Sequence, residues 1–240
     1  MKNRSLGALG LLLALAAVGV WALTGSQGVP GSRPESQRPT LLLLTSLPLV
    51  FGESFGLQSG GSPALTRLEK RYNVVPVGVA DSASLMGQDL LLMAHPRAQP
   101  AEVLVELDQW VRGGGRLLLL ADPRLDWPSS LPLGDRLRPP PAFADTGLLL
   151  HWGVKLSGPD RAGPARTSVG KLDVLTSSAG KLVSRNCRLA GDGFVARCRI
   201  GKGQATIIPD ADFLNVEILD GPSEENLDLM IDELDRLESR

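Results

Sequence analysis

Residues 89–123, DLLLMAHPRAQPAEVLVELDQWVRGGGRLLLLADP, place two apolar runs on either side of an amphipathic segment. The runs at 90–94 and 117–121 contain no polar residue, which is typical of strands that are covered on both faces. Between them, apolar residues recur at helical spacing after Pro100, a residue favoured at the start of helices. A strand, a helix and a second strand in this order predict an open, mostly parallel α/β sheet flanked by helices.

The three consecutive glycines, Gly113 to Gly115, resemble a phosphate-binding loop at first sight. In such a loop the glycines follow a strand and open a helix, so that helix N–H groups face the anion. Here they close a helix and open a strand, which is the position of a helix C-cap. We therefore interpret them as a turn, and expect ligands at the other end of the strand, where Asp122 emerges.

The same alternation extends in both directions and predicts one α/β domain over residues 40–240. Upstream, the apolar runs at 40–46 and 73–79 flank a helix that Ser62 and Pro63 are suited to begin. Downstream, a buried strand at 203–208 leads to an amphipathic closing helix. Between them we expect a proline-rich loop over 126–142, a short helix ending at Gly153, and an antiparallel hairpin insertion over 168–200, in which SVGKLDVLT forms one strand.

The N-terminal residues 1–23 predict a membrane anchor. Residues 6–23 contain no charge, and eighteen residues at a rise of ~1.5 Å span ~27 Å, enough for a bilayer core. Lys2 and Arg4 precede this segment, so the positive-inside rule places the domain outside the cytoplasm. A cleaved signal peptide is the alternative, with a cleavage site near residues 20–22. Residues 24–39, rich in Gly, Ser, Pro and Gln, are expected to be a flexible linker.

The composition restricts the classes of ligand. The formal net charge is −1, with 25 Lys and Arg against 26 Asp and Glu, and the basic residues are scattered. This argues against a nucleic-acid partner. With only two His and two Cys, we expect no metal site, and no motif indicates a cofactor.

The two cysteines are predicted to form a disulfide. Asp192 and Gly193 suit a two-residue hairpin turn. Counting outward from that turn places Cys187 opposite Cys198, and directly opposed residues have Cα atoms ~4.5–5.5 Å apart, within reach of a disulfide. The same register sets Arg188 opposite an arginine, a like-charge pair that counts against it. Two reduced core thiols are the alternative.

Six polar residues are expected at the carboxyl edge of the sheet, where they are candidate ligand-binding residues. These residues are Glu53, Ser54, His95, Asp122, Asp210 and Asp212. The three aspartates follow two strands that we expect to be neighbours. Carboxylates in a cleft support acid–base chemistry or bind cations, but aspartate also caps loops, which is the simpler interpretation.

The segment GESFG, residues 52–56, matches the G-x-S-x-G pattern of serine hydrolases, and Ser54, Asp122 and His151 follow in the order of a catalytic triad. That chemistry needs a helix directly after the serine, whereas GLQSGGS follows here. We therefore interpret 52–56 as a glycine-rich loop and keep an exported serine hydrolase as an alternative.

The order of LLLLTSLPLVFGE, the 89–123 segment, LLLHWGVKL, GKGQATIIPDADFLN and ENLDLMIDELDRL resembles the GldG-like auxiliary components of uncharacterised ABC-type transport systems, related to gliding-motility proteins. The resemblance covers nearly all of residues 40–237. It implies a fold similar to class I glutamine amidotransferases and flavodoxin. It does not imply their catalysis, because no cysteine stands on a strand-to-helix elbow.

The resemblance implies a non-catalytic accessory protein that binds a ligand or a partner. Its partners would be an ABC permease and ATPase. Residues 6–23 would anchor it, as a single-pass protein, in the bacterial inner membrane, with the C-terminal domain in the periplasm. The alternatives are the hydrolase that uses Ser54 and a purely structural scaffold.

Overall fold

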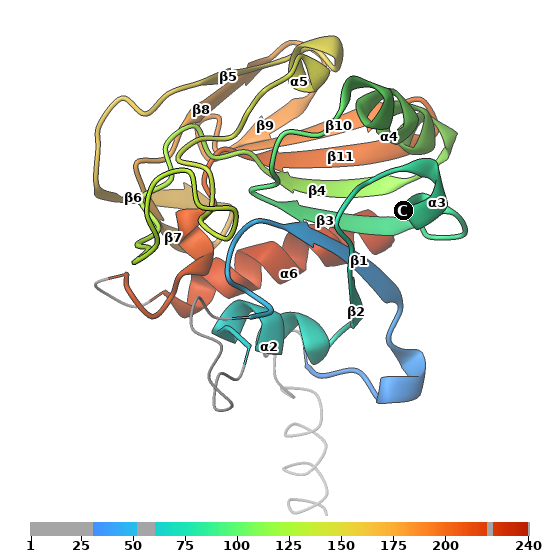
Figure 1. Cartoon of the computed structure of the whole chain (residues 1–240), viewed down its shortest axis with the longest axis horizontal. Helices are drawn as coiled ribbons and strands as arrows, with labels where there is room; N and C mark the ends of the chain where they lie inside the picture. Colours follow the sequence, from blue (N-terminus) through green and yellow to red (C-terminus); the bar gives the residue numbers. More distant parts are fainter. Residues whose placement is uncertain (1–30, 52–60, 220–222, 240) are drawn as a thin grey trace, which may run out of the picture. The chain divides into compact units, whose positions relative to one another are not determined.

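The computed structural model describes residues 31–51, 61–219 and 223–239, and its centre is a seven-stranded sheet (Figure 1). The strands are β1 (Thr40–Thr45), β2 (Asn73–Pro76), β3 (Leu90–Ala94), β4 (Arg116–Leu120), β9 (Arg188–Ala190), β10 (Val195–Ile200) and β11 (Gly203–Ile208). Their order in the sheet is β2-β1-β3-β4-β11-β10-β9. The first five are parallel, and β10 pairs antiparallel with both of its neighbours. The predicted α/β class with a mostly parallel sheet is confirmed.

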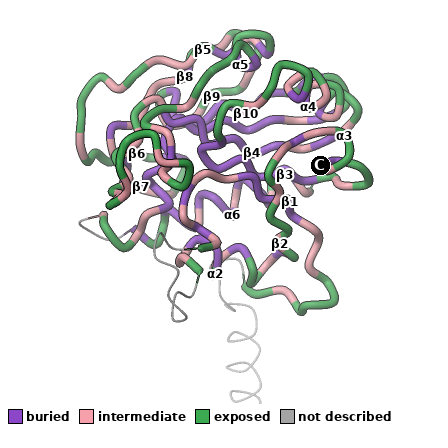
Figure 2. Tube along the Cα trace, viewed as in Figure 1, coloured by how far each residue is buried: buried purple, intermediate pink, exposed green. Residues whose placement is uncertain are grey.

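Apolar layers cover both faces of the central parallel strands β1, β3, β4 and β11, whereas the edge strand β2 is mostly exposed. In β1, Leu41 and Leu43 belong to one buried cluster, whereas Leu42 and Leu44 belong to the other. This division follows from the alternation of side chains across a strand. It explains why these strands contain continuous apolar runs, and the central strands are accordingly drawn as buried in Figure 2.

Helices form the outer layers. They are α2 (Pro63–Glu69), α3 (Ser82–Leu85), α4 (Ala101–Gly113), α5 (Leu148–His151) and α6 (Glu224–Glu238), with short 3₁₀ turns η1 (Glu35–Gln37) and η2 (Asp212–Leu214). Helices α2 and α6 pack into the cluster that contains Leu41, and α3, α4 and α5 pack into the cluster that contains Leu42. The start of α2 is as predicted, because the Ser62 hydroxyl accepts a hydrogen bond of 3.1 Å from the Leu65 N–H.

The three glycines form the turn between α4 and β4. Gly114 has a φ of +131°, a conformation that favours glycine, and its N–H donates to the Val111 carbonyl at 3.0 Å. A side chain on Gly115 would collide with the ring of Trp110, whose atoms lie 2.3 Å from an ideal Cβ. The glycines therefore end a helix and allow close packing.

Two small antiparallel sheets extend the domain. They pair β5 (Val154–Ser157) with β8 (Lys181–Ser184), and β6 (Pro164–Val169) with β7 (Leu172–Ser177). The expectation of one strand over SVGKLDVLT is wrong, because Gly170, with a φ of +65°, turns the chain between β6 and β7. The antiparallel region also begins earlier than 168, since β6 starts at Pro164.

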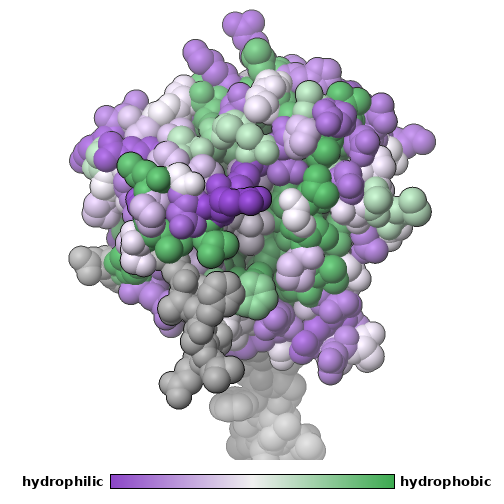
Figure 3. All heavy atoms as spheres, viewed as in Figure 1, coloured by the Kyte–Doolittle hydropathy of each residue, from purple (hydrophilic) through white to green (hydrophobic). Residues whose placement is uncertain are grey.

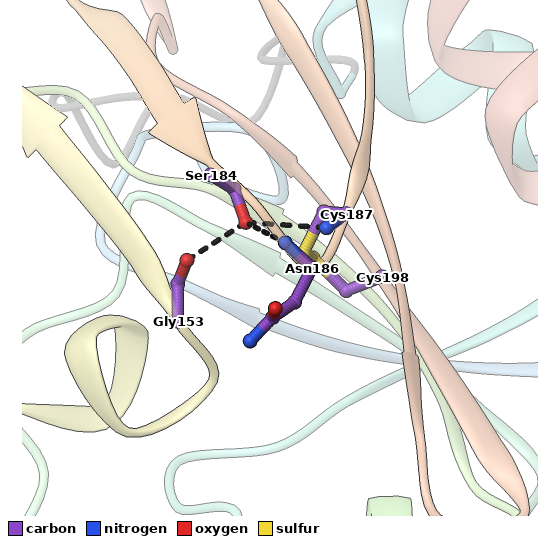
Figure 4. The surroundings of a disulfide bond; sticks show 5 residues. All are labelled: Gly153, Ser184, Asn186, Cys187 and Cys198. Atoms are coloured by element: carbon purple, nitrogen blue, oxygen red, sulfur yellow. Dashed lines mark hydrogen bonds between the residues drawn. A yellow bond between two sulfur atoms is a disulfide. The ribbon is translucent and has the colours of Figure 1, made fainter.

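The predicted disulfide is confirmed. Cys187 and Cys198 are bonded with Cα atoms 4.4 Å apart, and Leu189 pairs with Ala196 as the hairpin register requires. Around it, the Ser184 hydroxyl donates to the Gly153 carbonyl and accepts from the N–H groups of Asn186 and Cys187 (Figure 4). Arg188 also lies opposite Arg197, as the same register predicts.

The opposed arginines Arg188 and Arg197 are tolerated because Arg197 has an acidic partner. Its guanidinium donates two hydrogen bonds, of 2.8 and 2.5 Å, to the buried carboxylate of Glu233 on α6. This bidentate ion pair offsets the repulsion that the sequence suggested.

The predicted anchor, residues 6–23, lies outside the described residues. Across the described ranges, no helix has the length and apolar character that crossing a membrane requires. The end of the predicted linker differs from expectation, because Arg33 is bound to the domain. Its guanidinium donates to both carboxylate oxygens of Glu238, at 3.0 and 2.8 Å, and lies over the Tyr72 ring.

Candidate ligand-binding edge of the sheet

Three buried aspartates meet at the carboxyl edge of the sheet. β4 and β11 are adjacent and parallel, with Leu120 opposite Ile208, so the residues that follow them emerge side by side. A carboxylate oxygen from each of Asp122, Asp210 and Asp212 lies within 4.8 Å of the others. The structure therefore brings together the three aspartates that the sequence placed at neighbouring strand ends.

Backbone N–H groups occupy the carboxylates of two of these aspartates. Asp122 accepts from the N–H groups of Arg124 and Ala211, both at 2.8 Å. Asp210 accepts from the N–H groups of Ser177 and Phe213, both at 3.0 Å. These contacts join the exits of β4 and β11 to the end of β7, which is the loop-capping role that aspartate often has.

The network continues through residues that the sequence did not indicate. Asp212 accepts from the Asp126 N–H at 2.7 Å. The Asp126 carboxylate in turn accepts from the hydroxyl groups of Ser177 and Ser178, at 3.0 and 2.5 Å. No periodicity points to the two serines, because they end a hairpin strand far along the chain and only the tertiary fold brings them here.

Burial is the main cause of the raised pKa values of the three aspartates. It raises the pKa of Asp122 to about 6 and the pKa of Asp212 to about 8. It also raises the pKa of Asp210 well above its usual range, and the neighbouring carboxyls Asp122 and Asp212 add to this effect. With a pKa of about 8, Asp212 carries a proton at neutral pH. A cation held by the three carboxyls would displace that proton and compete with the N–H donors for oxygen atoms.

His95 lies at the end of β3, where it is fully buried and has a φ of +48°. Its Nε2 lies 2.8 Å from the Pro140 carbonyl oxygen, which can only accept, so Nε2 carries the hydrogen. Nδ1 has no hydrogen-bond partner among the described residues. Burial lowers the pKa of His95, which keeps the ring neutral. Its observed contact holds the proline-rich loop over 126–142.

The remaining predicted residues do not add to this cluster in the part of the chain that the structure describes. Glu53 and Ser54 lie outside the described residues. His151, the base of the hypothetical triad, is exposed on α5 and contacts Arg112 at 3.0 Å and Asp108 at 3.6 Å. Among the described residues, no hydrogen bond or ion pair joins His151 to Asp122, so the triad order of the sequence is not matched by a contact between the acid and the base.

A pocket of about 310 Å³ opens at the same edge of the sheet, at the carboxyl ends of β1 and β2. Thr45 and Ser46 lie in its wall, but their hydroxyl groups donate to the carbonyls of Ala94 and His95. Two arginines line it, Arg97 and Arg136. Neither arginine was predicted as a site residue from the sequence, although the position of Arg97 shortly after a parallel strand was a usable signal.

Comparison with known proteins bears on the fold. No family model and no curated protein matches the chain. Among solved structures, it is similar to the mmIFT52 N-terminal domain, at 15% identity and a TM-score of 0.57, covering 82% of this chain and 96% of that domain. It is also similar to Cytoplasmic Protein STM1381 from Salmonella typhimurium LT2, at 13% identity and a TM-score of 0.53, covering 82% of this chain and 99% of that one.

A third similar structure is an enzyme, the exo-beta-1,4-mannosidase Op5Man5 from Opitutaceae bacterium strain TAV5. The identity is 16% and the TM-score is 0.50 over 82% of this chain, which spans 36% of the mannosidase. At such identities the three likenesses concern the fold alone. The chain thus shares an α/β fold with proteins of different kinds, and its function has to be argued from its own residues.

Proposed function

We propose that the chain is a non-catalytic accessory component of an ABC-type transport system, and that its α/β domain binds a ligand or partner at the carboxyl edge of the sheet. The domain would lie in the periplasm, anchored in the bacterial inner membrane by residues 6–23. Its partners would be the permease and ATPase subunits. The finer fold in this proposal is that of class I glutamine amidotransferases and flavodoxin.

The pocket at the ends of β1 and β2 is the observation that carries the proposal. The order β2-β1-β3-β4-β11 corresponds to the order 2-1-3-4-5 of flavodoxin-like sheets. In such sheets the connection after β1 leads to the strand on one side of β1, and a later connection leads to the strand on its other side. Ligands bind outside the carboxyl ends of the strands where this direction changes. The pocket lies at this position, since β1, β2 and the segment after β3 all contribute to it.

The chemistry of the edge supports binding over catalysis. Both cysteines are joined in a disulfide, so neither is available as a thiolate nucleophile. The carboxylates of Asp122 and Asp210 are occupied by backbone N–H groups. On the face drawn in Figure 3, hydrophobic and hydrophilic side chains are interspersed, as on an ordinary protein surface.

Two observations support the proposed location. Structural disulfides form in oxidising compartments such as the periplasm, and this protein contains one. The uncharged segment 6–23 follows Lys2 and Arg4, which favours a cytoplasmic N-terminus. The role in a transport system is inferred from the resemblance to GldG-like auxiliary proteins.

Site-directed photo-crosslinking in cells tests the proposal. A benzoylphenylalanine at Leu137, which is 58% exposed at the pocket, should crosslink to a multi-span permease or its ATPase, identified by mass spectrometry. The same probe at Val105, 56% exposed on α4, is the matched control and should not. Absence of both subunits from the Leu137 adducts would refute the transport role. Fluorophosphonate labelling that disappears in Ser54→Ala would refute the non-catalytic assignment.

A further inference from the structure

The pocket at the carboxyl ends of β1 and β2 combines apolar walls with two arginines that form no ion pair with any described acidic residue. Its apolar lining comprises Leu43, Leu47, Pro48, Val50, Phe51, Pro76, Val77 and Leu137. Within the described ranges, none of the lining residues is acidic. The positive charges of Arg97 and Arg136 are therefore not compensated within the described part of the pocket.

The guanidinium of Arg97 is held in place by neutral groups. Its Nη2 donates to the backbone carbonyls of Arg136 and Arg138, at 2.7 and 2.5 Å. The Nη1 and Nε groups remain available, because a guanidinium has five N–H donors and only Nη2 is used in these bonds. An arginine that is fixed before binding loses less conformational entropy when it meets a ligand.

The second arginine, Arg136, has an unoccupied side chain. Among the described residues, no hydrogen bond or ion pair involves its guanidinium. The contact between its carbonyl and the Arg97 guanidinium brings two cationic residues to one pocket. An anion bound there would be attracted by both charges. Arginine pairs suit carboxylate and phosphate oxygens, which they bind through parallel N–H donors.

We propose that this pocket binds a small molecule that has an apolar body and one anionic group, either a carboxylate or a phosphate monoester. The apolar body lies against Leu43, Val77 and Phe51, and the anionic oxygens lie between Arg97 and Arg136. A volume of about 310 Å³ is at the lower end for small-molecule sites, so the ligand is compact. This assignment rests on the proposed binding function and names the class of ligand for the same edge.

Equilibrium dialysis with the full chain in lipid nanodiscs tests the assignment, with empty nanodiscs as the blank. The probes are 3-phenylpropanoate and octanoate, each compared with its neutral amide, and phenyl phosphate, compared with phenol. The charged probes should bind at least about tenfold more tightly than the neutral ones, because hydrogen bonds to charged groups contribute ~1.5–3 kcal/mol. The carboxylate and phosphate probes together show which anionic group is preferred.

Two variants test whether the arginines of this pocket, and not arginines elsewhere on the surface, cause the preference for charged probes. Arg97→Gln/Arg136→Gln should remove the preference for the charged probes and leave binding of the neutral probes unchanged. Arg161→Gln is the matched control, since Arg161 is exposed outside this pocket and its loss should change nothing. Circular dichroism confirms that each variant is folded.

The outcomes distinguish this inference from the proposed function. Equal binding of charged and neutral probes, or an unchanged preference in the double arginine variant, overturns the anionic assignment. Failure of every charged probe to bind also overturns it. Crosslinking of Leu137 to the permease is read separately, so the transport role can stand when the ligand class fails.

Discussion

Raising the pH from 4 to 8 is expected to destabilise the domain through its buried aspartates. The pKa of Asp122 is about 6 and the pKa of Asp212 is about 8, both above the ordinary value of 3.8. A carboxyl group whose pKa is raised in the folded state binds more protons there than in the unfolded chain. Its stabilising protonation is complete below the ordinary pKa and is lost as the pH rises through the folded-state value.

The size of the effect follows from the two shifts. One pKa unit corresponds to about 1.4 kcal/mol, so a rise from 3.8 to about 6 at Asp122 gives a loss of ~3 kcal/mol. The larger shift at Asp212 gives ~6 kcal/mol by the same conversion. Because these carboxyls share one network, their contributions overlap, and we expect a total loss of ~3–6 kcal/mol between pH 4 and pH 8.

The assay is urea unfolding at pH 4, 6 and 8, followed by tryptophan fluorescence, with EDTA present to remove divalent cations. Asp212→Asn keeps an oxygen that can accept from the Asp126 N–H and removes one ionisable group. Its free energy of unfolding should therefore depend less on pH than that of the wild type. Asp160→Asn, a change at an exposed aspartate, is the control and should preserve the wild-type dependence.

Two results would contradict the expected pH dependence. If the wild type and Asp212→Asn lost the same free energy of unfolding between pH 4 and pH 8, the cluster would not be the source of the pH dependence. A wild type that became more stable toward pH 8 would contradict the sign itself. Stabilisation by added Mg²⁺ or Ca²⁺ at pH 8, absent in Asp212→Asn, would show that the carboxyls bind a cation.

Three further changes test other parts of the structure, each by the midpoint of thermal or urea unfolding. Replacing Cys187 and Cys198 together by serine should cost ~3 kcal/mol, because the disulfide closes a loop with a sequence separation of 11; full stability without it would contradict its structural role. Gly114→Ala should cost ~1 kcal/mol, since its φ is +131°, whereas Gly113→Ala, in the helical last turn with nothing within 4 Å, should be neutral or stabilising. Glu233→Ala should cost ~2 kcal/mol, because a partly buried arginine loses its two hydrogen bonds; an effect equal to that of an exposed glutamate would argue against the pair.

Local chemistry along the chain was sufficient to predict most of the fold. The apolar runs of β1, β3 and β4, the capped helix at Ser62 and the glycine turn after α4 each have a local physical cause. The disulfide could also be predicted, because a two-residue turn determines which residues face each other in a hairpin. The reversal at Gly170 was missed because one glycine in an alternating run is compatible with a strand or a turn.

The site depended on contacts between distant segments. The sequence alone placed Asp122, Asp210 and Asp212 at strand ends, because parallel strands present their carboxyl ends at one edge. Only the tertiary structure decided that backbone N–H groups occupy Asp122 and Asp210, and that burial raises the pKa of all three carboxyls. Only the tertiary structure also brought Arg97 and Arg136 to one pocket, since a loop without periodicity carries the second arginine to the end of β1. The periodicity of apolar residues indicates which face of a helix or strand is buried. The partners of a polar side chain depend instead on which distant segments the fold brings next to it.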